Sequence, residues 1–229
     1  MTHDPQSIYL IPGMTPDFPV FTRLTPLLPV SSQLNFIAPK QHETLESYAD
    51  RMSEGLSPSA YVVGVSFGGL AALEICRKLR ANGCVLISSI RRPSQLPPWF
   101  RMFRGIDPPT ASALLNTVGY FADRFPDRLS TKSTIRLRKL SGSSGAWHRW
   151  ATTAVLNWKS KRFDFPILQI HGDADTTFPI RYVKPDVRIK NGKHALPISH
   201  PKETADAILA FITAISCERG RKVASLESW

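Results

Sequence analysis

Residues 61–75 read YVVGVSFGGLAALEI, and this stretch decides the fold of the chain. Residues 61–65 form a short apolar, β-prone run, and residues 70–79 are rich in good helix formers. Between them lies G-x-S-x-G (residues 64–68), here at a strand-to-helix turn. This pattern predicts that Ser66 lies at the tip of a sharp, strained turn, where the glycines leave room for neighbouring chain. A plain glycine-rich turn is the alternative.

Short apolar runs recur on both sides of this stretch, with helical spacing between them. Strands that alternate with helices predict βαβ units, a mostly parallel sheet and right-handed crossovers. Because the runs are apolar at almost every position, the sheet is expected to be buried on both faces, in a three-layer α/β fold. The six expected strands are residues 8–11, 34–38, 61–65, 84–87, 167–170 and 187–189, and the expected core helices are 44–56, 70–79 and 202–215.

The pattern changes after the fourth strand. Residues 91–162 are interrupted by prolines, rich in arginine and helical in their spacing, with no convincing strand. We expect a helical lid here, with helices over 111–121, 129–140 and 146–158. The predicted organisation is therefore an α/β core (1–90 and 163–216), the inserted lid (91–162) and a flexible basic tail (217–229).

Length and composition limit the class of protein. The chain has 229 residues, of which 42% are hydrophobic and 21% charged, which is typical of a globular domain. No stretch approaches 18 consecutive apolar residues, and the N-terminus lacks the pattern of a secretory signal, so no membrane insertion is expected. The three cysteines have no metal-ligand spacing and are expected to be reduced thiols of a cytoplasmic protein. No metal or cofactor is expected.

The net charge of +11 is confined to one segment. Residues 91–162 hold 14 of the 29 Lys and Arg residues but three of the 18 acidic ones, so the rest of the chain is neutral. A basic lid fits an acidic partner, such as an acyl carrier protein or coenzyme A, or it serves solubility alone. Nucleic acid is not expected as a partner, because no recognition motif accompanies the charge.

Serine at its ordinary pKa is a poor nucleophile, so Ser66 needs a base, and the base needs an orienting acid. In this turn context the chain order is serine, acid, histidine. The fifth strand runs into HGDADTTFP (residues 171–179), and the sixth runs into NGKH (residues 191–194). Both strands end at the same sheet edge as Ser66, so His194 is the expected base, whereas His171 is expected to be structural.

Two carboxylates compete for the role of the acid. Asp175 lies further out on the loop and precedes Phe178-Pro179, which turns the chain toward the histidine. Asp173 is better suited to bracing the loop through backbone hydrogen bonds. We therefore prefer Asp175, with Asp173 as the alternative.

An oxyanion hole needs two backbone N–H donors aimed at the developing negative charge. Phe67 follows the serine at the start of a helix and supplies one. The turn after the first strand, Pro12-Gly13-Met14, supplies the second, with Met14 as the expected donor because proline has no N–H. Pro12-Gly13 as a mere strand stop is the alternative.

Together these segments resemble the α/β-hydrolase superfamily, and in particular compact bacterial serine hydrolases with a helical lid. The resemblance implies the strand order 2-1-3-4-5-6. It also implies Ser66 as nucleophile, Asp175 as acid, His194 as base, and Met14 and Phe67 as oxyanion donors. Two departures are Ile-Pro-Gly where many members carry a His-Gly pair, and a missing N-terminal hairpin. The matching segments are IYLIPGMTPDFPVF (8–21), VVGVSFGGLAALEI (62–75), VLISSI (85–90), WHRWATTAVLNW (147–158), IHGDADTTFPI (170–180) and IKNGKH (189–194).

The leading expectation is a serine hydrolase that cleaves a small-molecule carboxylic ester or thioester through an acyl-enzyme on Ser66. One alternative is a hydrolase or acyltransferase that acts on an acidic acyl carrier, and another is a non-catalytic, ligand-binding member of the fold. The lid aromatic residues, Trp147, Trp150 and Trp158 among them, either line an apolar acyl pocket or fasten the lid to the core.

Overall fold

The computed structural model describes residues 7–102, 145–159 and 162–226. Its centre is a six-stranded sheet in the order β2-β1-β3-β4-β5-β6, and every neighbouring pair is parallel. The predicted sheet and its strand order are confirmed. The strands are β1 (Ile8–Ile11), β2 (Ser31–Gln33), β3 (Tyr61–Val65), β4 (Gly83–Ile87), β5 (Ile167–Gly172) and β6 (Val187–Ile189).

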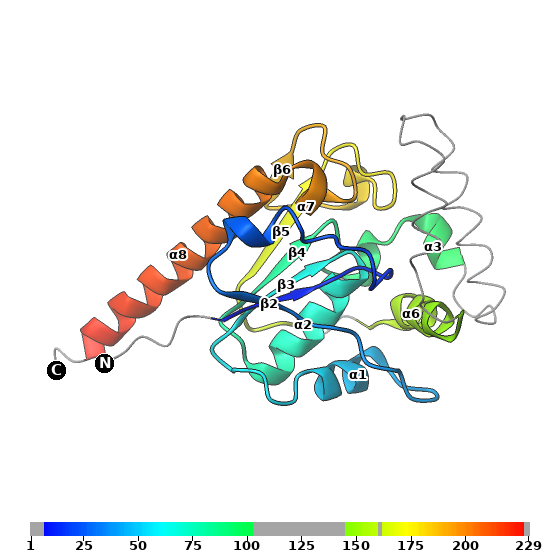
Figure 1. Cartoon of the computed structure of the whole chain (residues 1–229), viewed down its shortest axis with the longest axis horizontal. Coiled ribbons are helices and arrows are strands. Elements are labelled where there is room, and N and C mark those ends of the chain that lie inside the picture. The colour runs from blue at the N-terminus through cyan, green and yellow to red at the C-terminus, as the bar shows by residue number, and fades with distance from the viewer. Residues whose placement is uncertain (1–6, 103–144, 160–161, 227–229) are drawn as a thin grey trace.

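Helices cover both faces of this sheet (Figure 1). Helices α1 and α2 lie on one face, and the long helix α8 lies on the other. The α-helices are α1 (Leu45–Met52), α2 (Phe67–Leu79), α3 (Pro98–Met102), α6 (Gly145–Asn157), α7 (Leu196–Ser199) and α8 (Pro201–Leu226), and the 3-10 turns are η1 (Thr25–Leu27), η2 (Pro93–Gln95) and η3 (Ile180–Tyr182).

The apolar strands build two separate cores. Along β3, Val62 packs into a cluster with α1, α2 and α6, whereas Tyr61 and Val63 pack into a second cluster with α8. Successive side chains of a strand point to opposite faces, so a run that is apolar throughout fills both clusters. All five residues of β3 are buried, which explains why this strand shows no alternation of polar and apolar residues.

The second strand lies upstream of its predicted position. The apolar run 34–38 was the expected strand, but β2 is formed by residues 31–33 at the sheet edge, where the side chains are partly or fully exposed. Leu34 and Phe36 instead pack against the first core cluster, and the ring of Phe36 lies 4.6 Å from that of Trp147. Hydrophobicity therefore marked residues that pack against the first core cluster, not the strand itself.

The last helix is longer than predicted. The expected end near residue 215 is wrong, because α8 continues to Leu226 and residues 217–226 of the expected tail are helical. Up to residue 221, where the described side chains end, Ile215 is the last buried apolar position. Beyond it, polar contacts hold the helix, including a hydrogen bond from the Arg219 guanidinium to the Asn82 side chain.

Among the described residues between β4 and β5 are the helices α3 and α6, and α6 coincides with the expected helix 146–158. The expected helices 111–121 and 129–140 lie outside the described residues. No helix in the described ranges is long and apolar enough to cross a membrane.

Candidate active site

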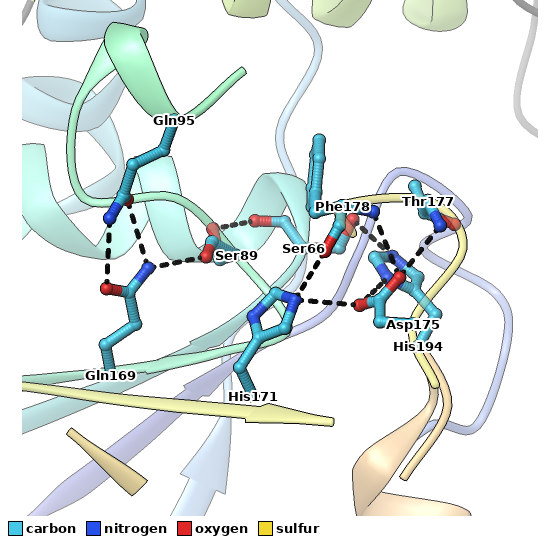
Figure 2. A network of polar contacts seen from close by, with 9 residues as sticks. All are labelled: Ser66, Ser89, Gln95, Gln169, His171, Asp175, Thr177, Phe178 and His194. Atoms are coloured by element: carbon cyan, nitrogen blue, oxygen red, sulfur yellow. Dashed lines mark hydrogen bonds and ion pairs between the residues drawn. The ribbon is translucent and has the colours of Figure 1, made fainter. Parts of the chain in front are cut away.

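Ser66 lies between β3 and α2, at the carboxyl edge of the sheet. Its backbone has φ 54° and ψ −120°, a combination that is strained for a residue with a Cβ atom. Such strain is typical of a residue that the surrounding structure holds for function. Ser66 takes the N-cap position of α2, but its side chain does not cap the helix. The hydroxyl points instead toward His194 (Figure 2).

The two glycines of the motif make this turn possible. A Cβ atom on Gly64 would lie 2.1 Å from the Gly68 carbonyl oxygen, and one on Gly68 would lie 2.2 Å from the Pro12 carbonyl oxygen. Both distances are shorter than any real Cβ contact, so a side chain at either position would displace backbone. The loop after β1 therefore passes directly over the first turn of α2.

A continuous hydrogen-bonded chain links three of the predicted residues. His194 Nε2 lies 2.9 Å from Ser66 Oγ, and His194 Nδ1 lies 2.8 Å from Asp175 Oδ2 (Figure 2). Because a carboxylate only accepts hydrogen bonds, Nδ1 carries the ring proton and Nε2 is free to accept one. This tautomer allows the serine proton to pass to the imidazole.

Asp175 is held in place by its own loop. Its Oδ1 accepts hydrogen bonds from the backbone N–H groups of Thr177 (2.8 Å) and Phe178 (3.0 Å). Burial raises the pKa of the Asp175 carboxyl, but hydrogen bonds from His171 and His194 hold the pKa well below its usual range. Asp175 is 3% exposed, so this residue is a buried carboxylate that stays ionised.

Asp173 occupies a different position on the same loop. It accepts hydrogen bonds from the Arg188 guanidinium (3.0 Å) and from the Asn191 backbone N–H (2.6 Å). Desolvation raises the pKa of this carboxyl, but the hydrogen bonds from Arg188 and Asn191 have the larger combined effect. The pKa of Asp173 therefore lies below its ordinary value. Asp173 thus joins the loops that follow β5 and β6, and the structure brings Asp175, not Asp173, to His194.

Of the two predicted oxyanion residues, Phe67 directly follows Ser66 in the chain, and Met14 directly follows Gly13, which lies close to the serine. Phe67 is the first residue of α2, where backbone N–H groups have no partner within the helix. Gly13 packs against the serine: a Cβ atom built on it would lie 3.6 Å from Ser66 Cβ. Met14 is the next residue in the chain, so its N–H group belongs to the same loop after β1.

His171, expected to be structural, contacts the same carboxylate. Its Nε2 lies 2.7 Å from the Phe178 carbonyl oxygen and 3.3 Å from Asp175 Oδ2. Both neighbours are acceptors, so Nε2 carries the proton. The ring is fully buried, and within the described part of the chain its Nδ1 has no hydrogen-bond partner.

The sequence analysis missed a buried polar network beneath the serine (Figure 2). Ser89 Oγ donates to the Ser66 carbonyl oxygen (2.6 Å), and the Gln169 side chain donates to the Ser89 carbonyl oxygen (2.8 Å). Gln169 also donates to the Gln95 side-chain oxygen (3.1 Å). The available signal was Gln169 itself, a polar residue within an apolar strand, because buried polar groups need partners.

Three tryptophans at the end of the lid segment hydrogen-bond to the core. The indole N–H of Trp147 donates to the Met14 carbonyl oxygen (2.9 Å), that of Trp150 to the Glu43 carbonyl oxygen (2.8 Å), and that of Trp158 to the Glu74 carboxylate (2.9 Å). These bonds favour the fastening role over the lining of an acyl pocket. A cavity of about 890 Å³ between α6 and residues 39–46 is not lined by Ser66, Asp175 or His194.

Solved structures share this fold at low sequence identity, which speaks for the fold alone. A thermophilic esterase from Thermogutta terrifontis has a TM-score of 0.65 and 20% identity, covering 92% of this chain and 90% of that one. A hydrolase from Pseudomonas aeruginosa PA01 has a TM-score of 0.65 and 16% identity, with 90% and 89% covered. An epoxide hydrolase from metagenomes of hot environments has a TM-score of 0.61 and 14% identity, with 91% of each chain covered.

The sequence comparisons give the family. Curated proteins show no match to the chain. The family model described as the alpha/beta hydrolase family matches residues 9–207, which includes β1 from its second residue, the other five strands, and the residues of the hydrogen-bonded chain. The chain therefore belongs to the alpha/beta hydrolase family.

Proposed function

We propose that this alpha/beta hydrolase is a serine hydrolase of carboxylic esters or thioesters. The observation that carries the proposal is the Ser66–His194–Asp175 hydrogen-bonded chain at the strained strand-to-helix turn. A residue that only shaped the turn would have no need of a histidine at 2.9 Å and a buried carboxylate behind it. The buried, ionised Asp175 gives the imidazole the tautomer that a general base requires.

In the first half-reaction, Ser66 Oγ attacks the acyl carbonyl carbon while His194 Nε2 takes the hydroxyl proton. The carbonyl π bond opens and places negative charge on its oxygen, giving a tetrahedral intermediate. When the intermediate collapses, the bond to the leaving alcohol or thiol breaks, and His194 returns the proton to that group. The acyl group remains as an ester of Ser66.

The negative charge of the intermediate needs donors that are already in place. The backbone N–H groups of Phe67, next to Ser66, and of Met14, next to Gly13, fit this role, and the positive end of α2 adds to it. In the second half-reaction, water takes the place of the leaving group. His194 removes a proton from the water, the hydroxide attacks the acyl carbon, and Ser66 leaves with the proton, which releases a carboxylic acid.

A series of acyl esters and acyl thioesters of increasing chain length tests the proposal, with kcat/KM as the readout. We expect turnover that peaks at one chain length and disappears in a Ser66→Ala variant. A wild-type protein that turns over no ester and no thioester would contradict the hydrolase proposal and favour a non-catalytic, ligand-binding member of the fold.

The charge of the lid supports a narrower candidate, an acyl group carried by an acidic protein or by coenzyme A. The whole surplus of 11 positive charges lies within residues 91–162. Such a field speeds the arrival of an anionic substrate and weakens as salt rises. With salt raised from about 20 to 300 mM, we expect kcat/KM to fall for an anionic thioester and to stay level for a neutral short ester.

A lid variant supplies the control for this salt experiment. Replacing Arg124, Arg128, Arg136 and Arg138 by Gln removes four positive charges and should flatten the salt dependence of the anionic substrate. If kcat/KM depends on salt equally for both substrates in the wild-type protein, the positive charge of residues 91–162 does not attract the anionic substrate, and this proposal is wrong.

A further inference from the structure

The contacts of Trp147 connect helix α6 to both residues proposed as oxyanion donors. Its indole N–H donates to the carbonyl oxygen of Met14 at 2.9 Å. Its ring meets the ring of Phe67 edge to face, with the centroids 5.7 Å apart and an interplanar angle of 89°. One side chain therefore contacts both sides of the site where negative charge would develop.

We propose that Trp147 is a positioning residue, which holds the Met14 N–H group in the direction that an oxyanion requires. The inference rests on the proposed hydrolase function. The direction of a backbone N–H is set by the torsions on either side of its peptide bond, so it is fixed only when both neighbouring groups are fixed. Gly13 lies close to Ser66 on one side, where an added Cβ atom would be in van der Waals contact with the serine, and the bond from Trp147 holds the Met14 carbonyl group on the other.

The Trp147 ring is itself immobilised, as a positioning residue must be. It is 6% exposed and packs against Phe36, with the ring centroids 4.6 Å apart, and against Tyr48 at 6.2 Å. The Tyr48 hydroxyl is in turn anchored on the Ile37 carbonyl oxygen at 2.8 Å. A donor held from several sides loses little freedom when the reaction begins, which is the condition for effective charge stabilisation.

Trp150, one turn later on α6, offers a matched control. Its indole N–H also donates to a backbone carbonyl oxygen, that of Glu43, at 2.8 Å. Its ring also meets Phe67 nearly edge to face, at 5.9 Å and 83°. Trp150 thus shares with Trp147 the helix, the type of hydrogen bond and the contact with Phe67, but its bond goes to residue 43 and not to Met14.

The experiment compares Trp147→Phe with Trp150→Phe in the full chain. Both variants keep an aromatic ring and lose an indole–carbonyl hydrogen bond, so similar decreases in thermal unfolding midpoint are expected. For Trp147→Phe we expect kcat on the best ester to fall about tenfold with little change in KM, because a misaligned donor affects the transition state. For Trp150→Phe we expect kcat within about twofold of wild type.

A transition-state analogue separates this role from general loosening. A trifluoromethyl ketone adds Ser66 to its carbonyl and places an oxyanion between the two donors. Its inhibition constant should rise in Trp147→Phe by the same factor by which kcat/KM falls, and it should stay near the wild-type value in Trp150→Phe. Equal kinetic effects of the two variants, or a change in KM alone, would overturn the positioning role and leave the hydrolase proposal intact.

If Trp147→Phe fails to fold, the same test is made with β-(3-benzothienyl)alanine at position 147. This residue keeps the shape of the indole ring but has sulfur in place of the N–H group. The same loss of kcat is expected, and unchanged kcat would overturn the proposal. A wild-type protein without Ser66-dependent turnover would remove the hydrolase proposal first, and this inference with it.

Discussion

The loop after β5 and the loop after β1 hold their functional groups in different ways. Asp175 is fixed by backbone N–H groups two and three residues further along its own loop. Met14 is fixed by Trp147, a side chain 133 residues away on helix α6. The comparison teaches that the proposed acid is held by its own loop in the α/β core, whereas the proposed oxyanion donor also depends on helix α6.

Ser66→Ala should have the largest effect, because both loops serve this hydroxyl. We expect kcat to fall by about 10⁴- to 10⁶-fold while the thermal unfolding midpoint stays close to that of the wild type. Steady-state kinetics with the best ester and circular dichroism provide the two readouts. Turnover close to that of the wild type would contradict the assignment of Ser66 to the chemistry.

Asp175→Asn removes the carboxylate that contacts His194 and leaves the loop after β1 unchanged. An asparagine amide beside His194 Nδ1 favours the wrong ring tautomer, so kcat should fall by about 10³- to 10⁴-fold. This loss should exceed that of Trp147→Phe by at least about tenfold, because one change alters the base itself and the other misaligns a donor. The reverse ranking of the two variants would contradict the division of the site into these two sides.

The pH profile sharpens the same comparison. Burial raises the pKa of Asp175, but hydrogen bonds from His171 and His194 leave it below its usual value, so this carboxylate stays ionised well below pH 5. Because a general base works only in its unprotonated form, activity should fall as the pH is lowered, and protonation of Asp175 should not contribute to this fall until the pH lies below the ordinary range of that carboxyl.

The two sides of the site should differ in this pH profile. Trp147 does not titrate, so Trp147→Phe should lower the rate without moving the midpoint of the acid limb. Asp175→Asn removes the ionised partner of the proposed base, so its pH profile should differ in shape from that of the wild type. A wild-type rate that does not fall at low pH would count against a general base.

Asp173→Asn should have the smallest effect. This carboxylate joins two loops through Arg188 and Asn191 and does not contact His194. Its ion pair with Arg188 is partly exposed to solvent, where such pairs contribute little, so we expect kcat within about threefold of wild type. A decrease in kcat as large as that expected for Asp175→Asn would indicate that Asp173 is the acid instead.

Much of the fold could be predicted because the strands carry a local signal. The strands β3, β4 and β5 are short apolar runs bounded by glycine or polar turns, and these properties are visible without neighbours. The edge strand was placed wrongly because residues 31–33 are polar and their pairing with β1 depends on tertiary contacts. The extension of α8 past Ile215 was missed because residues 217–221, which continue the helix, are exposed and carry no apolar periodicity.

The candidate site divides in the same way. Ser66, Asp175 and His194 could be found because each follows the end of a strand, and parallel strands end at one sheet edge. The contact between Trp147 and Met14, and the bond from Ser89 to the Ser66 carbonyl, join residues far apart in the chain. No spacing rule connects such pairs, so only the folded structure brings them to notice.

The central claim is that Ser66 is the nucleophile, and covalent labelling tests it most directly. An alkyl fluorophosphonate forms a phosphorus–oxygen bond with an activated serine and releases fluoride. Intact mass spectrometry of the wild-type protein should show one adduct, which tryptic digestion maps to residues 52–77, the peptide that contains Ser66. The adduct should be absent from Ser66→Ala. No adduct, or one that persists in this variant, would contradict the account.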